Sequence, residues 1–112
     1  RDNEKSRELK RIYENKCQVC NHRIQKPNND YYSEVHHIWP LGKKPVGGDD
    51  DCENMLVLCP NHHAEFDYGV IKITKDKENI IDEDKNTRKI FFREDHIIAQ
   101  KNIDQQFEDN VK

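Results

Sequence analysis

Residues 59–67 read Cys-Pro-Asn-His-His-Ala-Glu-Phe-Asp, and the rest of the chain is interpreted from this stretch outward. The stretch carries one thiol, two imidazoles and two carboxylates, and its proline suits the first turn of a helix. On such a helix His63 and Asp67 share one face, whereas Cys59 and His62 share another. One short helix could therefore hold two metal ions, one on each side. The alternative is a solvated helix that happens to be rich in histidine.

The spacing of the cysteines favours the metal-binding alternative. Cys17 and Cys20 are spaced as C-x-x-C, and Cys59 and His62 are spaced as C-x-x-H. The two pairs form the usual tetrahedral zinc pattern, and no secretory feature favours disulfides instead. We therefore predict a structural Zn²⁺ held by Cys17, Cys20, Cys59 and His62. Cys52 has no partner at this spacing and is left outside the site.

The composition also favours a metal cross-link. The chain of 112 residues is one domain at most, with 33% hydrophobic and 37% charged residues. A core this small does not stabilise a chain of this length by burial alone. No apolar run is long enough to span a membrane and no signal-peptide pattern is present, so we expect a cytoplasmic protein without membrane contact. The start at Arg1, without a methionine, favours a domain excised from a larger protein.

Residue patterns predict an α+β domain over residues 1–112, with a core at residues 17–69 and extensions on both sides. A turn is expected at residues 27–30, because proline, asparagine and aspartate follow one another there. The helix begun at Cys59 should end at Gly69. The predicted strands are residues 31–38, 55–58 and 70–74, with weaker ones at 80–81 and 89–92. The predicted flanking helices are residues 6–15 and 95–107, the second broken near Asn102.

Charge is unevenly distributed along the chain. Residues 1–26 carry eight basic and four acidic side chains, whereas residues 27–71 carry two basic and eight acidic ones. A basic arm beside an acidic centre fits a surface that grips a nucleic-acid backbone next to a cation site. The alternative is a solvated helix face. The residues we assign to nucleic-acid binding are Lys5, Arg7, Lys10 and Arg11.

A second constellation overlaps the first. His36 and His37 end the first core strand, Asn54 precedes the second, and His63 lies in the helix. This order, with the intervening loop that contains Pro40 and Gly47-Gly48, resembles the HNH nuclease family. The similarity covers residues 17–69. The resemblance implies a zinc-stapled ββα-metal fold, with flanking helices and an extra β-hairpin within residues 70–112. One departure is His62, where zinc-bearing members more often have a fourth cysteine.

The resemblance also implies the chemistry. It assigns a catalytic set of His37, Asn54 and His63, with His37 as the general base and Asn54 orienting the base or its loop. It assigns His36 and His63 as ligands of one divalent cation, Mg²⁺ or a transition metal such as Mn²⁺ or Ni²⁺. A neutral imidazole can take the proton of a water at physiological pH, and a divalent cation can relieve charge on the phosphate oxygens. The expected reaction is hydrolysis of duplex DNA, leaving 5′-phosphate and 3′-hydroxyl ends.

Several alternatives stay open at this stage. Asp67 is either a third metal ligand or a hydrogen-bond partner of the turn at Gly69. His36 and His37 should point to opposite faces of a regular strand. Both can serve one site only if the substrate phosphate lies between the metal and the far edge of the strand, or if the strand twists sharply before Pro40.

The rival functions are a non-catalytic zinc module that binds nucleic acid and a nuclease directed at RNA. No helix-turn-helix or tandem zinc-finger pattern is present, so we expect any sequence specificity to come from a recognition domain in the same parent chain. The target sequence and the oligomeric state are not indicated by the sequence.

Overall fold

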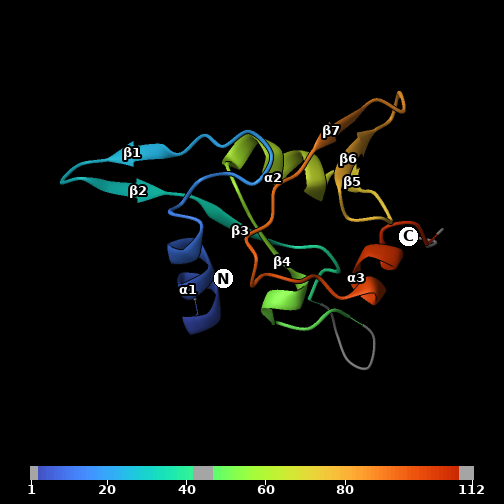
Figure 1. Cartoon of the computed structure of the whole chain (residues 1–112), viewed down its shortest axis with the longest axis horizontal. Coiled ribbons are helices and arrows are strands. Elements are labelled where there is room, and N and C mark those ends of the chain that lie inside the picture. The colour runs from blue at the N-terminus through green and yellow to red at the C-terminus, as the bar shows by residue number, and fades with distance from the viewer. Residues whose placement is uncertain (1–2, 42–46, 109–112) are drawn as a thin grey trace.

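The computed structural model describes residues 3–41 and 47–108, so Arg1 of the expected excision point lies outside it. Eleven elements follow one another along these residues (Figure 1). None of the helices among the described residues has the length and apolar character that crossing a bilayer requires. The elements are α1 (Glu4–Ile12), β1 (Ile24–Lys26), β2 (Asp30–Tyr32), β3 (Glu34–His37), the 3₁₀ turn η1 (Cys52–Asn54), β4 (Met55–Leu58), α2 (Pro60–Asp67), β5 (Ile71–Ile73), β6 (Asn79–Asp82), β7 (Thr87–Lys89) and α3 (Gln100–Gln105).

The antiparallel pair β3–β4 lies at the centre of the molecule. The register places His36 opposite Leu56 and His37 opposite Met55. All four residues of β4 are fully buried, because each face of the strand packs on a different layer. Met55 and Val57 pack with the α1 side, whereas Leu56 and Leu58 pack with α2 and the later elements. This double burial explains the uninterrupted apolar run, which the sequence analysis interpreted correctly as a strand.

The helix α2 begins and ends where the sequence predicts. Cys59 is its N-cap and Pro60 occupies its first turn. Gly69 adopts a left-handed φ of 77°, and its amide donates to the carbonyl of Phe66. Glycine takes this conformation without steric cost, so the helix stops here. The strand–strand–helix unit β3–β4–α2 is the ββα-metal core expected from the sequence.

The two edges of the β3–β4 pair differ. Gln18, in the knuckle between the first two cysteines, covers the outer edge of β4. Its amide donates to the carbonyl of Val57 at 2.9 Å, and its side-chain Oε1 accepts from the amide of Val57 at 2.9 Å. The side-chain amide of Gln18 also donates to the carbonyl of Phe91 at 2.8 Å. The outer edge of β3 pairs with no described strand.

The N-terminal part differs from the prediction in three respects. The helix α1 occupies residues 4–12 rather than 6–15, because Asn3 and Ser6 form a reciprocal capping box at its start. The predicted strand 31–38 is divided at Ser33 into β2 and β3. The strand β2 pairs with β1, which the sequence analysis did not predict. The expected turn at 27–30 closes this hairpin, with positive φ at Asn28 and Asn29. The hairpin projects from the body of the molecule (Figure 1).

The C-terminal part required two corrections. Residues 70–89 form a three-stranded antiparallel sheet, β5–β6–β7, instead of a hairpin, and the last strand is residues 87–89 rather than 89–92. The final helix is residues 100–105 only. Asn102 does not break it: this side chain is buried and donates to the carbonyl of Glu53 at 2.8 Å. Ile98 and Ile103 are buried by tertiary packing, so their apolar spacing reflected the core rather than one continuous helix.

A buried hydrogen-bond chain joins α1 to the C-terminal part. The Tyr13 hydroxyl lies 2.6 Å from Nδ1 of His96 and accepts from the amide of Arg93 at 3.0 Å. Nε2 of His96 lies 3.0 Å from the carbonyl of Cys52. These partners define a neutral His96 with its proton on Nε2. Burial lowers the pKa of His96 from 6.5, and burial likewise raises the pKa of Tyr13 to about 12.

We expect stability to fall in acid through His96. The folded state resists protonating this imidazole, whereas the unfolded chain binds the proton below pH 6.5. The contribution is therefore complete above pH 6.5 and is lost as the pH falls toward the lower folded pKa. His96→Gln keeps one acceptor and one donor but cannot titrate. Urea unfolding at pH 7.5 and 5.5 should give a smaller loss of stability in this variant than in the wild type; equal losses would contradict the assignment.

Candidate active site and zinc-type cluster

Three side chains from β3 and α2 form a cluster suited to one metal ion. His63 and Asp67 lie one turn apart on α2, and His36 reaches them from β3. Nδ1 of His36 lies 3.2 Å from a carboxylate oxygen of Asp67, and Nε2 of His63 lies 3.5 Å from the other. One donor atom from each residue lies within 4.8 Å of the others. The geometry therefore brings together the two predicted ligands and the residue whose role the sequence left open.

His36 is held as a neutral imidazole. Its ring is buried and stacks on Phe66 of α2, with 5.0 Å between ring centroids. Burial, with the neighbouring His63 and His37, lowers the pKa of His36 to about 3. Protons therefore do not compete for its nitrogen lone pair near neutral pH, which is the condition for ligating a metal.

Glu34 orients His63 and was missed by the sequence analysis. Its Oε1 accepts from Nδ1 of His63 at 2.6 Å, which leaves the Nε2 lone pair directed toward the cluster. The Tyr32 hydroxyl donates to Oε2 of the same carboxylate at 2.6 Å, and this bond, together with His63, lowers the pKa of Glu34. A carboxylate behind a ligating histidine is common at metal sites. Strand geometry could have identified Glu34 from the sequence, because residues 34 and 36 lie on the same face of a strand.

His37 faces the opposite side of β3. Its neighbour Val35 packs on the α1 side, and Nε2 of His37 donates to Oδ1 of Asp50 at 2.9 Å. The other carboxylate oxygen of Asp50 accepts from the side-chain amide of Asn3 at 2.6 Å. Because a carboxylate only accepts, the proton of neutral His37 lies on Nε2 and the lone pair lies on Nδ1. No sequence signal separated Asp50 from its neighbours in the triple aspartate.

One cleft contains both groups. It has a volume of about 280 Å³ and lies across the open edge of β3. Residues from opposite faces of the strand therefore line one common cleft. Which of the two arrangements left open by the sequence applies stays a prediction. The lining residues are Val35, His36, His37, Pro40, Leu41, His63 and Asp67.

Asn54 shapes the loop beside this cleft and contacts neither histidine group. Its side chain is fully buried; it accepts from the amide of Trp39 at 2.8 Å and donates to the carbonyls of Trp39 at 2.8 Å and Asp49 at 2.9 Å. Gly48 packs against the Asn54 side chain so closely that an added Cβ would lie 2.6 Å from the Asn54 amide nitrogen. These hydrogen bonds join Trp39 and Asp49 on the two sides of the loop, and the role of Asn54 in orienting the base or its loop stays a prediction.

The second predicted cluster also assembles. Sγ of Cys59 lies 3.3 Å and Sγ of Cys17 lies 3.6 Å from Nδ1 of His62, and Sγ of Cys20 lies 3.9 Å from Sγ of Cys59. Tetrahedral zinc would separate two sulfurs by about 3.8 Å and a sulfur and a nitrogen by about 3.6 Å. The four donors therefore fit one tetrahedral ion that joins the cysteine knuckle to the start of α2. Cys52 lies outside the cluster, as expected.

The predicted basic residues lie on α1. Arg7, Lys10 and Arg11 recur at spacings of three and four, and they line a common hollow. Lys5 lies elsewhere, 3.9 Å from the carboxylate of Asp51. Arg11 pairs with Glu8 within the helix. The helix therefore presents three of the four predicted residues to one surface.

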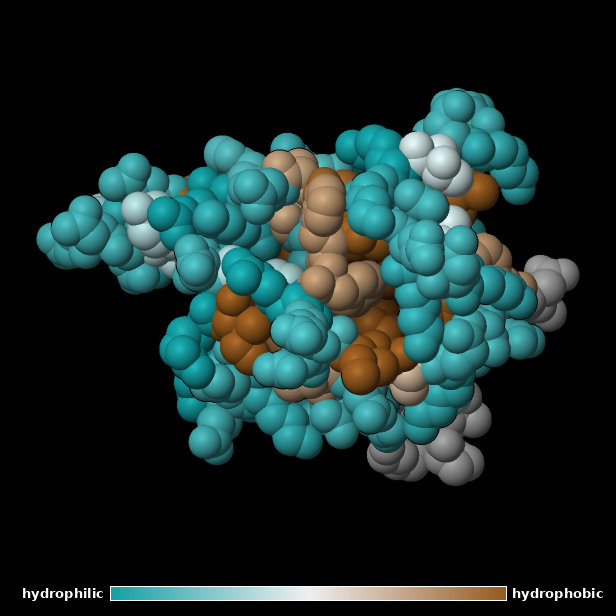
Figure 2. Space-filling view, in the orientation of Figure 1, coloured by the Kyte–Doolittle hydropathy of each residue, from teal (hydrophilic) through white to brown (hydrophobic). Residues whose placement is uncertain are grey.

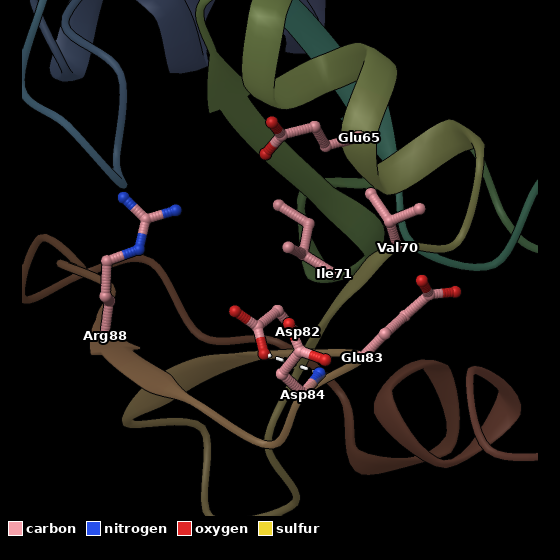
Figure 3. Close-up of a pocket in the computed structure, with 7 residues that line it drawn as sticks. All are labelled: Glu65, Val70, Ile71, Asp82, Glu83, Asp84 and Arg88. Atoms are coloured by element: carbon pink, nitrogen blue, oxygen red, sulfur yellow. Dashed lines mark hydrogen bonds between the residues drawn. The ribbon is translucent and has the colours of Figure 1, made fainter.

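A different hollow, of about 250 Å³, lies between α2 and the β6–β7 turn (Figure 3). Its charged lining consists of four carboxylates and Arg88, and Asp82 accepts from the amide of Asp84 to shape the turn. None of its lining residues belongs to either ligand cluster. This hollow is therefore separate from both candidate metal sites.

Comparison with known proteins agrees with this geometry. Residues 17–74, more than half of the chain, match the family model described as HNH endonuclease. The chain therefore belongs to the HNH endonuclease family. The matched segment contains both ligand clusters, Asn54 and the complete ββα unit.

Individual relatives cover different parts of the chain. The type IV methyl-directed restriction enzyme EcoKMcrA of Escherichia coli K12 is 47% identical over 38 residues, which are 34% of this chain and 13% of that enzyme. Anaredoxin of Nostoc sp. strain PCC 7120 is 31% identical over 67 residues, 60% of this chain and 76% of that protein. The modification-dependent restriction endonuclease TagI superposes with a TM-score of 0.79 at 34% identity, covering 88% of this chain and 34% of TagI. The chain thus spans only a minor part of both restriction enzymes.

Proposed function

We propose that this chain hydrolyses phosphodiester bonds of DNA at the edge of β3, as the cleavage module of a restriction or defence protein. His37 is the general base, and His36, His63 and Asp67 hold one divalent cation. The observation that carries the proposal is the single cleft lined by His37 and by this three-residue cluster. The similarity to two restriction enzymes supports DNA as the substrate.

The protein's own groups perform the proton transfer. Asp50 keeps the proton of His37 on Nε2, so Nδ1 takes the proton of a water as that water attacks phosphorus. The bond from phosphorus to the 3′-oxygen breaks and this oxygen takes a proton from a solvent water, which leaves a 5′-phosphate and a 3′-hydroxyl. A divalent cation bound by the cluster would supply charge neutralisation at the phosphate oxygens. Two imidazoles and a carboxylate suit Mn²⁺, Ni²⁺ or Mg²⁺.

The ion of the second cluster is proposed to be Zn²⁺. Three thiols and an imidazole are soft ligands that favour zinc, and four protein donors leave no open position for a substrate. The Cys₃His cluster is therefore structural in this proposal, and only the cation held by His36, His63 and Asp67 serves the reaction.

The isolated chain should cut DNA weakly and at many sequences. In this proposal the basic side chains of α1 contact phosphates, and phosphate contacts carry no sequence information. Digestion of a long duplex with Mn²⁺ at low and moderate salt, followed by mapping of the ends, measures this; His37→Ala is the inactive control. Cleavage should fall steeply with salt, since counterion release supplies most of the binding. Cutting at one short motif, undiminished by salt, would contradict the expectation, and cutting of RNA alone would favour the RNA-directed alternative.

Asp50→Asn should lower kcat/KM by on the order of 10²-fold without changing metal affinity. The aspartate accepts from both His37 and Asn3. An amide has only one accepting oxygen, so its NH₂ group would oppose one of these two donors. The measurements are initial rates and Mn²⁺ titration calorimetry. Asp49→Asn makes the same chemical change at a neighbouring exposed carboxylate and should behave as wild type; equal losses in both variants would reject the assignment.

A further inference from the structure

A basic groove lies between α1 and the β1–β2 hairpin. It has a volume of about 490 Å³. Figure 1 shows the hairpin extending beyond the end of α1, and Figure 2 shows a recess between the two with a mostly hydrophilic surface. The lining residues are Arg7, Lys10, Arg11, Asn15, Lys26, Asp30, Tyr31, Tyr32 and Ser33. The sequence analysis found only the α1 wall of this groove, because it did not predict the hairpin.

The groove carries a net positive charge although the chain as a whole is acidic, and two of its cations already have carboxylate partners: Lys26 pairs with Asp30 at 3.3 Å and Arg11 pairs with Glu8. Four of its lining residues are arginine or lysine and one, Asp30, is acidic, whereas the net charge of the chain is −3. The positive groups come from both walls: three lie on α1, and Lys26 lies on β1. A cation from each wall can contact an anionic chain that runs between them.

The groove is connected to the candidate active site through Tyr32. This residue lines the groove, and its hydroxyl donates to Glu34 at 2.6 Å. Glu34 in turn accepts from His63 at 2.6 Å. Two hydrogen bonds therefore separate the floor of the groove from a residue of the metal cluster. A polymer held in the groove would continue directly toward the cleft at β3.

We propose that this groove binds the sugar-phosphate backbone of the DNA strand that is cut, beside the scissile phosphate. The proposal rests on the function proposed above and identifies where its substrate lies. Cations on two facing walls fit a single backbone that runs between them. The hairpin is then a substrate-binding element, and the contacts position the strand without conveying sequence.

Neutralising the groove should weaken DNA binding where matched neutralisation elsewhere does not. The groove variant combines Arg7→Gln, Lys10→Gln and Lys26→Gln. The control variant removes the same charge from the C-terminal sheet and its turns, through Lys75→Gln, Lys85→Gln and Lys89→Gln. Both are made in the His37→Ala background, and fluorescence anisotropy of a labelled duplex is measured without added divalent cation. We expect Kd to rise tenfold or more in the groove variant only, and the salt slope to fall by about 0.9 per lost phosphate contact.

A variant that strengthens binding excludes misfolding as the explanation. Asp30→Asn removes the only carboxylate that lines the groove within the described part of the chain, so Kd should fall several-fold. Asp76→Asn, in another exposed turn, should leave Kd unchanged. Equal Kd values in the groove and control variants would overturn the proposal, as would weakened binding of an RNA duplex with unchanged binding of DNA. Because binding is measured without cleavage, a wild-type chain that never cuts would refute the proposed function while leaving this test intact.

Discussion

His37→Ala should abolish cleavage while the affinity for a divalent cation remains within about threefold of wild type. General bases contribute on the order of 10²–10⁴ to a rate, and removing the group forfeits that factor. His37 lies outside the three-residue cluster and bonds to Asp50 across the strand. The substitution therefore removes the proton acceptor and leaves all three proposed ligands in place.

His63→Ala should have the complementary effect. It removes one of the three donors, so Mn²⁺ affinity should fall by more than roughly 10–100-fold. That range is typical when the replaced residue only hydrogen-bonds to a metal ligand. Excess cation should restore part of the activity, because the base is still present. His36→Ala should act similarly, although its buried ring also packs on Phe66, so His63 provides the cleaner comparison.

Mn²⁺ titration calorimetry and plasmid nicking, measured on the same preparations, separate the two roles. Zinc content determined in parallel shows that the Cys₃His cluster is intact in each variant. If His37→Ala loses Mn²⁺ while His36→Ala retains it, the assignment within this histidine pair is reversed.

Cys17→Ser should leave an unfolded or aggregated chain. The cysteine belongs to the cluster that joins the knuckle at residues 17–20 to the start of α2. Structural zinc contributes on the order of 10 kcal/mol or more to the folding of small domains, a large amount for a chain with 33% hydrophobic residues. The measurements are circular dichroism and native mass spectrometry, which should find one zinc ion in the folded wild type.

Cys52→Ser is the matched control. It removes a thiol that lies outside the cluster, so it should fold and retain zinc. Active wild-type protein without bound zinc would disprove the structural role, and a folded, active Cys17→Ser variant would show that the remaining contacts suffice.

Local patterns predicted the central elements. The buried run at β4, the proline at the start of α2 and the glycine after its end are short-range signals, and each appears where it was expected. The residues of both predicted ligand sets also lie together in the structure. Part of this grouping follows from local geometry, because residues three and four apart on a helix share a face whatever surrounds it. The roles of the individual residues remain predictions.

Elements that depend on distant partners were predicted less well. The strand β1 is exposed throughout and has little apolar pattern, so only its pairing with β2 identifies it. Ile97, Ile98 and Ile103 suggested one long helix, but the backbone of Ala99 bonds to Glu53 instead of continuing a helix upstream. Tertiary contacts outweighed local propensity in both places.

The sequence by itself determined which donors exist and how they are grouped: the Cys₃His set, the His36–His37 pair, and the face shared by His63 and Asp67. These follow from covalent spacing and local geometry. Only the tertiary structure decided that Asp50 holds His37, that Glu34 stands behind His63, and that the two faces of β3 meet in one cleft. It also created the basic groove, because its walls come from separate segments. These features depend on contacts between residues that are far apart in the chain. Local spacing in the sequence does not reveal such contacts.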